Sequence, residues 1–200
     1  MSSKTKKNRT AQIYRKFEDT DRLLIEVSLD RHEDIFNEWD PAPFKRRDID
    51  PDLRAFLDEC SLEISLKFPI AIAFYLPKSE IDLEKQQKCV EGLHNFFTFN
   101  KYLAEKQIIR SRKNALKYFA IGGIFLAVAV GLEHMFEKNV LFDLLGQGLF
   151  IGGWVFAWEG VTVLAFKNSA LMRRVERWER FLDAPIVFKK DRKPDQMFEK

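Results

Sequence analysis

Two long apolar windows in the C-terminal half constrain this 200-residue chain more than any other feature. The first runs from Tyr118 to Leu132 without a charge, and the second from Leu144 to Phe166, interrupted only by Gln147 and Glu159. As a helix the first window covers about 22 Å, or about 28 Å when it is extended to Phe136, close to the thickness of a bilayer core. The pair predicts either a transmembrane hairpin or the buried helical hairpin of a soluble protein.

The placement of basic residues favours the membrane. Five Lys or Arg residues stand in the fifteen residues before the first window, five in the fourteen after the second, and one between them. Because cytoplasmic flanks of membrane helices carry the excess of Lys and Arg, we expect two spans, at about 118–136 and 144–166, in the inner (cell) membrane with both termini cytoplasmic. The side chains expected at anionic lipid headgroups are Arg110, Arg112, Lys113, Lys117, Arg173 and Arg174.

Alternating apolar residues predict a small sheet before the first window. Residues 22–30 alternate as in a strand, and every even position from 62 to 76 is apolar, which predicts one long strand with these side chains on a single face. Pro69 interrupts the second run, so we expect an edge strand or two strands broken by a bulge. Asp50 followed by Pro51 predicts the start of a short helix over about 51–60.

Helical periodicity dominates the rest of the chain. From Ser79 onward it indicates a helix that runs as a stalk into the first span, with Gly92 as a point where it could bend. Residues 170–185 form an amphipathic pattern that predicts a helix lying on the stalk or on anionic lipid, followed by a short strand at 186–188.

The expected fold class is α+β, a small cytosolic sheet-and-helix domain joined by a long helix to a two-helix transmembrane hairpin. Its expected parts are a flexible basic arm over 1–20, the cytosolic domain and the start of the stalk over 21–105, the juxtamembrane helix and two spans over 106–166, and a cytosolic amphipathic helix and tail over 167–200.

Glu159 is the one carboxyl in the two apolar windows 118–132 and 144–166. Counted from Phe166 it lies about 10 Å deep, and charged residues inside a span usually face protein or water. Its place on a helical wheel near Gly148 and Gly152 predicts that it points into a helix interface. The functional interpretation is a proton or ion relay; the structural one is a hydrogen-bonded Glu that specifies packing.

Small residues recur at four-residue spacing in both windows and predict close helix packing, either within the hairpin or between subunits. They are Gly123, Ala127 and Gly131 in the first window and Gly148 and Gly152 in the second.

The string DPAPFKRRDIDPD, residues 40–52, is the most motif-like soluble segment. Asp40, Asp48, Asp50 and Asp52 could bind a cation, but their spacing matches no EF-hand and Arg46 and Arg47 stand among them. A rigid Pro-bounded turn with a helix cap is therefore the alternative. The string resembles a D-P-x-P-F-x-x-R-D-[LI]-D motif of small uncharacterised bacterial two-span membrane proteins. The resemblance implies a bacterial origin and a shared cytosolic element, and it brings no activity.

No catalytic or cofactor motif is readable. Cys60 and Cys89 form no CxxC pair, and His32, His94 and His134 are scattered, so we expect two free thiols, no metal site, no cofactor and no enzymatic activity. The basic segments flank a membrane window, which makes nucleic acid an unlikely partner.

Three hypotheses of function follow. The first is a membrane-anchored interaction or scaffolding module that forms a homo-oligomer and can bind a cytosolic protein. The second is an oligomeric ion or proton channel that uses Glu159. The third is a membrane-bound enzyme acting through the Asp-rich loop.

Overall fold

The computed structural model describes residues 13–43, 47–135 and 140–190, and the chain divides into two compact units. The first unit comprises Met1–Lys101 with Glu176–Lys200, and the second comprises Tyr102–Val175. Most of the predicted basic arm, and the turn between the apolar windows at 136–139, lie outside the described residues. The chain from Glu176 onward therefore belongs to the same unit as the N-terminal domain.

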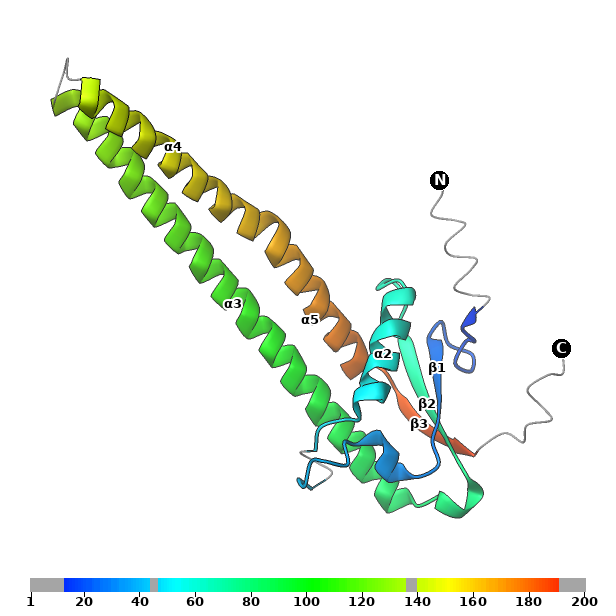
Figure 1. Cartoon of the computed structure of the whole chain (residues 1–200). Helices are drawn as coiled ribbons and strands as arrows, with labels where there is room; N and C mark the ends of the chain where they lie inside the picture. Colours follow the sequence, from blue (N-terminus) through cyan, green and yellow to red (C-terminus); the bar gives the residue numbers. More distant parts are fainter. Residues whose placement is uncertain (1–12, 44–46, 136–139, 191–200) are drawn as a thin grey trace. The chain divides into compact units, whose positions relative to one another are not determined.

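Three parallel strands form the centre of the first unit (Figure 1). They are β1 (Leu23–Ser28), β2 (Ile70–Leu76) and β3 (Ile186–Lys190), in the order β1-β2-β3. Parallel neighbours need a long crossover connection. Helix α2 (Pro51–Glu63) connects β1 to β2, and the whole helical hairpin connects β2 to β3. The α+β class and the C-terminal strand are confirmed.

The prediction of one long strand from 62 to 76 is wrong. Helix α2 continues to Glu63, Leu62 at its end is 66% exposed, and β2 begins only at Ile70, directly after Pro69. β2 is also the central strand, not an edge, and Ala71 and Ala73 are as fully buried as its alternate residues. Strands of parallel sheets are covered on both faces and read as continuous apolar runs, as Ile70–Leu76 does. The alternating residues before Pro69 belong to the end of α2 and to the bends that follow it.

The predicted cap of α2 is confirmed, although the helix is longer than expected. One oxygen of the Asp50 carboxylate accepts hydrogen bonds from the backbone N–H of Asp52 at 2.8 Å and of Leu53 at 3.1 Å. These N–H groups have no partner within the helix. Pro51 stands at the first position, where its missing N–H costs nothing.

Helix α3 (Leu83–Met135) is continuous over 53 residues (Figure 1). It follows the 3-10 turn η2 (Lys78–Glu80), and a second 3-10 turn, η1 (His32–Ile35), lies between β1 and α2. The Asp82 carboxylate accepts bonds from the N–H groups of Glu84 and Lys85 at the start of α3, and this holds the pKa of that carboxyl below its usual range. The helix passes through Gly92 without interruption, so the stalk is continuous.

An aromatic cluster joins α3 to α5 (Asn168–Leu182) within the first unit. The ring of Phe97 stacks on Phe181 with centroids 5.2 Å apart and lies 6.1 Å from Trp178, which also meets Phe96 edge-on at 6.0 Å. All four side chains are buried. An ion pair between Lys101 and Glu179, at 2.9 Å, lies in the same unit. Of the two predicted positions for the amphipathic helix, this part of it therefore takes the one on the stalk.

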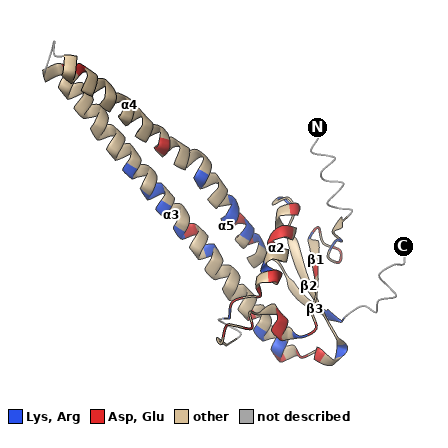
Figure 2. Ribbon diagram, viewed as in Figure 1, with Lys and Arg blue, Asp and Glu red and all other residues tan. Residues whose placement is uncertain are grey.

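The second unit contains two antiparallel helices, the last part of α3 and α4 (Val140–Thr162), followed by a π-helical segment η3 (Val163–Lys167) (Figure 1). The two helices Leu83–Met135 and Val140–Leu182 are long and apolar enough to cross a membrane, and in each only 17% of the most apolar window is buried. Figure 2 shows the upper parts of α3 and α4 without Lys or Arg, which gather on α5 and lower on α3.

Candidate functional site

Small residues at seven-residue spacing bring α3 and α4 into close contact. Ala115, Gly122 and Ala129 are buried on α3, and Gly146, Gly153 and Gly160 are buried on α4. A Cβ added to Gly122 would lie 2.8 Å from the carbonyl oxygen of Gly153, and one on Gly153 would lie 2.7 Å from Leu126 Cγ. Backbone therefore packs on backbone at this crossing, as small residues permit in membrane helices.

This heptad of small residues was missed by the sequence analysis, which followed four-residue spacing. Of the predicted glycines, Gly152 alone lies close to the hairpin partner: a Cβ added to it would lie 3.2 Å from the ring of Phe125. Gly123, Gly131 and Gly148 have open space where a Cβ would stand, and Ala127 is exposed. The signal that was readable is the repeat of Ala or Gly every seven residues in both windows, the period of a left-handed helix pair.

Glu159 forms an ion pair with Lys167 across the junction of α4 and η3. The distance from Nζ to Oε1 is 3.2 Å, and the two side chains are 41% and 61% exposed, with Glu159 the less exposed. The carboxylate is therefore half-exposed instead of pointing into the contact between α3 and α4, which passes through its neighbour Gly160. Single π-helical turns within helices occur frequently at functional sites, and Lys167 is the last residue of η3.

The register of the hairpin places Glu159 near the beginning of the first apolar window. On α3, Phe119 contacts Gly160, so that a Cβ on the glycine would lie 3.0 Å from the ring. Tyr118 and Glu159 line the same open hollow of about 650 Å³. Glu159 on α4 is thus level with Tyr118 on α3, the residue that follows the basic Lys117. The depth of about 10 Å counted from Phe166 along its own helix alone therefore overstates how far Glu159 lies from the basic end of the hairpin.

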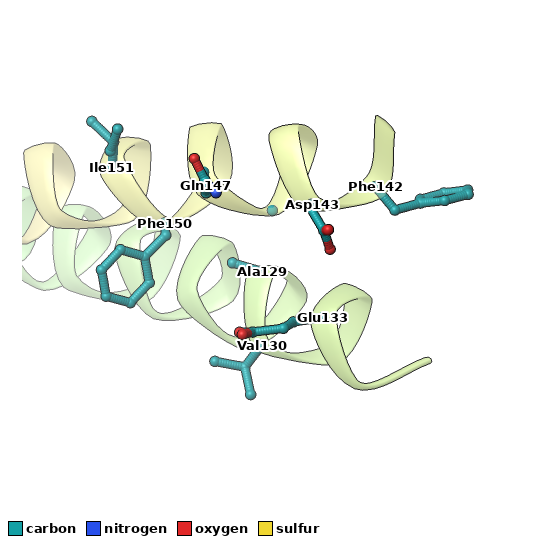
Figure 3. Close-up of a pocket in the computed structure, with 9 residues that line it drawn as sticks. Ala129, Val130, Glu133, Phe142, Asp143, Gln147, Phe150 and Ile151 are labelled. Atoms are coloured by element: carbon teal, nitrogen blue, oxygen red, sulfur yellow. The ribbon is translucent and has the colours of Figure 1, made fainter. Parts of the chain in front are cut away.

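The other end of the hairpin holds a hollow of about 570 Å³ between α3 and α4. Figure 3 shows Glu133 of α3 and Asp143 of α4 extending toward the same space, with Gln147 one turn further along. Glu133 and Asp143 are exposed. Among the described residues no group of three or more His, Cys, Asp or Glu side chains is placed to hold a metal ion.

The Asp-rich loop is held by its own carboxylates. Asp40 accepts hydrogen bonds from the backbone N–H of Ala42 at 2.9 Å and of Asp48 at 2.8 Å, which lowers the pKa of the Asp40 carboxyl. The Nε of Arg47 donates to the carbonyl of Ala42 at 2.9 Å. Asp50 caps α2, and Phe44, Lys45 and Arg46 of the motif lie outside the described residues. The described residues of this segment thus form the hydrogen-bonded turn and helix cap of the structural alternative.

The six basic residues predicted at lipid headgroups lie on the surface, whereas the nearby Arg180 is buried. Arg110, Arg112, Lys113, Lys117 and Arg173 are exposed and Arg174 is half-buried. Arg180, which contributed to the count of basic residues after the second window, is only 8% exposed. Its guanidinium bonds to α2 and is therefore not available to lipid.

Two buried polar groups lie on η1 and on α3. His32 is fully buried, and neither of its ring nitrogens has a hydrogen-bond partner among the described residues; its ring lies 5.6 Å from Phe188. The thiol of Cys89 donates weakly to the His32 carbonyl at 3.9 Å. Burial raises the pKa of Cys89 to about 12, so this thiol is protonated and unreactive at neutral pH. Cys60 is likewise free and buried.

Comparison with models of known protein families, with curated proteins and with solved structures finds no match to this chain. The resemblance of residues 40–52 to a bacterial membrane-protein motif therefore stays a prediction.

Proposed function

We propose that this chain is an integral membrane protein whose α3–α4 hairpin crosses the bilayer twice. The observation that carries the proposal is the exposure of large apolar side chains on both helices, among them Ile124 at 62%, Val155 at 62% and Trp158 at 70%. Water-soluble proteins seldom expose contiguous apolar patches of this extent. In lipid the same side chains incur no such cost, and helices satisfy their own backbone hydrogen bonds.

The orientation we propose places the sheet-containing unit and both termini in the cytoplasm, at the inner membrane. Arg180 is occupied at α2, which leaves four basic residues between 167 and 180: Lys167, Arg173, Arg174 and Arg177. Four still exceed the single Lys138 of the turn, so the asymmetry that orients a membrane hairpin persists. The exposed basic side chains would contact anionic headgroups.

The function we propose is that of a membrane-anchored, self-associating interaction or scaffolding module, able to hold a cytosolic protein at the membrane. The hairpin lies between β2 and β3 in the chain, so both of its helices are joined to strands of the same sheet. Such a connection anchors the sheet-containing unit to the membrane by two helices. Gly123, Gly131 and Gly148 leave outward faces on which another helix can pack closely.

The alternative of an ion or proton channel has less support. Gly122 and Gly153 pack too closely for water to pass between the two helices of one hairpin, so a pore would need several subunits. Glu159 is half-exposed and paired with Lys167.

Membrane insertion and orientation are tested on the full chain in its native membrane. The protein should stay in the pellet after an alkaline wash. A thiol at Trp39→Cys should be labelled by an impermeant maleimide only from the cytoplasmic side, because Trp39 is 93% exposed in the sheet-containing unit. Release of monodisperse protein without detergent, or labelling from the outside, would refute the proposed placement.

The choice between module and channel is tested in liposomes. The wild type should show no proton or ion flux above that of empty vesicles, and Glu159→Gln should leave both flux and oligomer size unchanged. Glu176→Gln, on the exposed part of α5, serves as the matched control. A wild-type flux that disappears only in Glu159→Gln, with the oligomer intact, would establish the channel instead.

A further inference from the structure

Exposed apolar side chains recur along α3 at seven-residue spacing. Tyr102, Ile109, Leu116 and Val130 are 54%, 56%, 70% and 59% exposed. Gly123, at the same spacing, has open space where a Cβ would stand. Seven residues return to within about 20° of the same side of a helix, so these five positions form one seam that turns slowly around α3 and is about 42 Å long. A second helix can follow such a seam by winding around it in a left-handed supercoil.

This seam differs from the one that holds the hairpin together. Each of its positions Leu116, Gly123 and Val130 follows by one residue a buried position of the α4 contact: Ala115, Gly122 and Ala129. One residue is a rotation of about 100° around the helix. The seam is therefore not covered by α4, and all of it lies within the second unit.

The seam continues from the polar part of α3 into its apolar part. Tyr102 and Ile109 stand among charged residues before Lys117, whereas Gly123 and Val130 stand in the apolar window. A lipid would cover only the apolar part, and a water-soluble protein only the polar part. The partner that covers both is a helix that changes from polar to apolar at the same level.

We propose that two copies of this chain associate through this seam, with their α3 helices parallel and related by a two-fold axis along the bilayer normal. The inference rests on the proposed function as a self-associating membrane protein, and it specifies the face. A second α3 in the same membrane has the required polarity change at the same level. In lipid, Gly123 with Ala120 and Ala127 permits close approach. In water, Ile109 and Leu116 supply apolar burial.

Lys106 and Lys113 oppose this association. In the heptad that contains Ile109 and Leu116 they occupy the other inward position, so each would lie near its counterpart in the second copy. A charged residue at such a position sets register at a cost in stability. The association should therefore be reversible, and Lys113→Leu should strengthen it.

Disulfide cross-linking of the full chain in native membranes tests the seam. Ile109→Cys and Leu116→Cys should give a cross-linked dimer on mild oxidation. Gln107→Cys and Asn114→Cys are matched controls, because they are also exposed and lie two residues earlier, on the opposite side of the helix. The wild type should give none, since Cys60 and Cys89 are buried.

A second measurement separates this inference from the proposed function. Native mass determination in lipid nanodiscs should give a dimer, and Leu116→Glu should raise its dissociation constant at least about tenfold relative to Asn114→Glu. A dimer that cross-links equally at control and seam positions, or that ignores Leu116→Glu, would overturn the seam while self-association stands. A strictly monomeric protein would overturn both, and a cross-link to a different protein would replace the second copy as the occupant.

Discussion

The guanidinium of Arg180 closes the C-terminal end of α2 through Ser61, 119 positions earlier in the chain. Nη2 donates to the carbonyl oxygen of Ser61 at 2.7 Å and to its hydroxyl at 2.6 Å, and Nη1 donates to the carbonyl of Ile64 at 3.1 Å. The last carbonyls of a helix have no partner within it and carry the negative end of its dipole. Burial, and to a lesser extent Arg177, lowers the pKa of Arg180 to about 10. The segment after the hairpin is thereby attached to the helix before it.

Replacing Arg180 tests this attachment. Arg180→Ala leaves the buried carbonyls of Ser61 and Ile64 without donors, so the free energy of unfolding should fall by about 3 kcal/mol. Arg180→Lys should recover only part of the loss, because an ammonium lacks the planar fork that reaches several carbonyls. Urea unfolding followed by circular dichroism measures both, with the exposed Arg173→Ala as control. An equal loss in the control would contradict the capping role.

Trp178 offers a matched comparison within the sheet-containing unit. It is 4% exposed in the cluster of Phe96, Phe97 and Phe181, whereas Trp39 is 93% exposed. Trp178→Ala should lower the free energy of unfolding by about 3–5 kcal/mol through loss of burial and the cavity left behind. Trp39→Ala should change it by less than about 0.5 kcal/mol. Chemical denaturation distinguishes the two, and a small effect at Trp178 would refute the cluster.

The adjacent glycines of α3 should respond differently to the same substitution. Gly122→Leu must displace the backbone of Gly153, so the hairpin should be destabilised by about 1–3 kcal/mol. Gly123→Leu meets open space within the chain and should leave hairpin stability nearly unchanged while weakening the dimer. Thermal unfolding in detergent, at a protein concentration below the dissociation constant of the dimer, measures the first effect. Equal destabilisation by both would mean that the packing face is misplaced.

The Asp40 carboxyl predicts a pH dependence of the loop. Its pKa in the folded loop is lowered, mainly by the backbone N–H of Asp48 and then by that of Ala42, so folding favours the carboxylate. The resulting stabilisation is complete above the ordinary Asp pKa of 3.8 and is lost as the pH falls through the lowered value. Hydrogen exchange at the Ala42 and Asp48 amides, corrected for intrinsic rates, should accelerate in that range. Asp40→Ala should accelerate it at neutral pH, whereas the exposed Asp52→Asn should not; unchanged exchange in Asp40→Ala would contradict this role.

Local sequence was enough for several elements and misleading for one. Asp50-Pro51 carries its own capping chemistry, and Pro185 ends α5 before the strand at Ile186, so both boundaries were readable. The alternation before Pro69 was not a strand, because the capped helix α2 continues to Glu63 and residues 64–69 form the bends and turns that lead into β2. Periodicity over so few residues does not exclude helix when the helix start lies nearby.

The sequence by itself determined the two apolar helices and their basic flanks, because these follow from runs of side chains along one stretch of chain. The structure decided that α3 is continuous through Gly92, where the sequence left a bend open. Only the tertiary structure decided that Arg180 serves α2 instead of lipid, and that Gly122 packs while Gly123 stays open. It also placed Glu159 beside Tyr118. These relationships join residues that are distant in the chain or depend on a rotation of about 100° between neighbours on a helix, and neither is set by local composition.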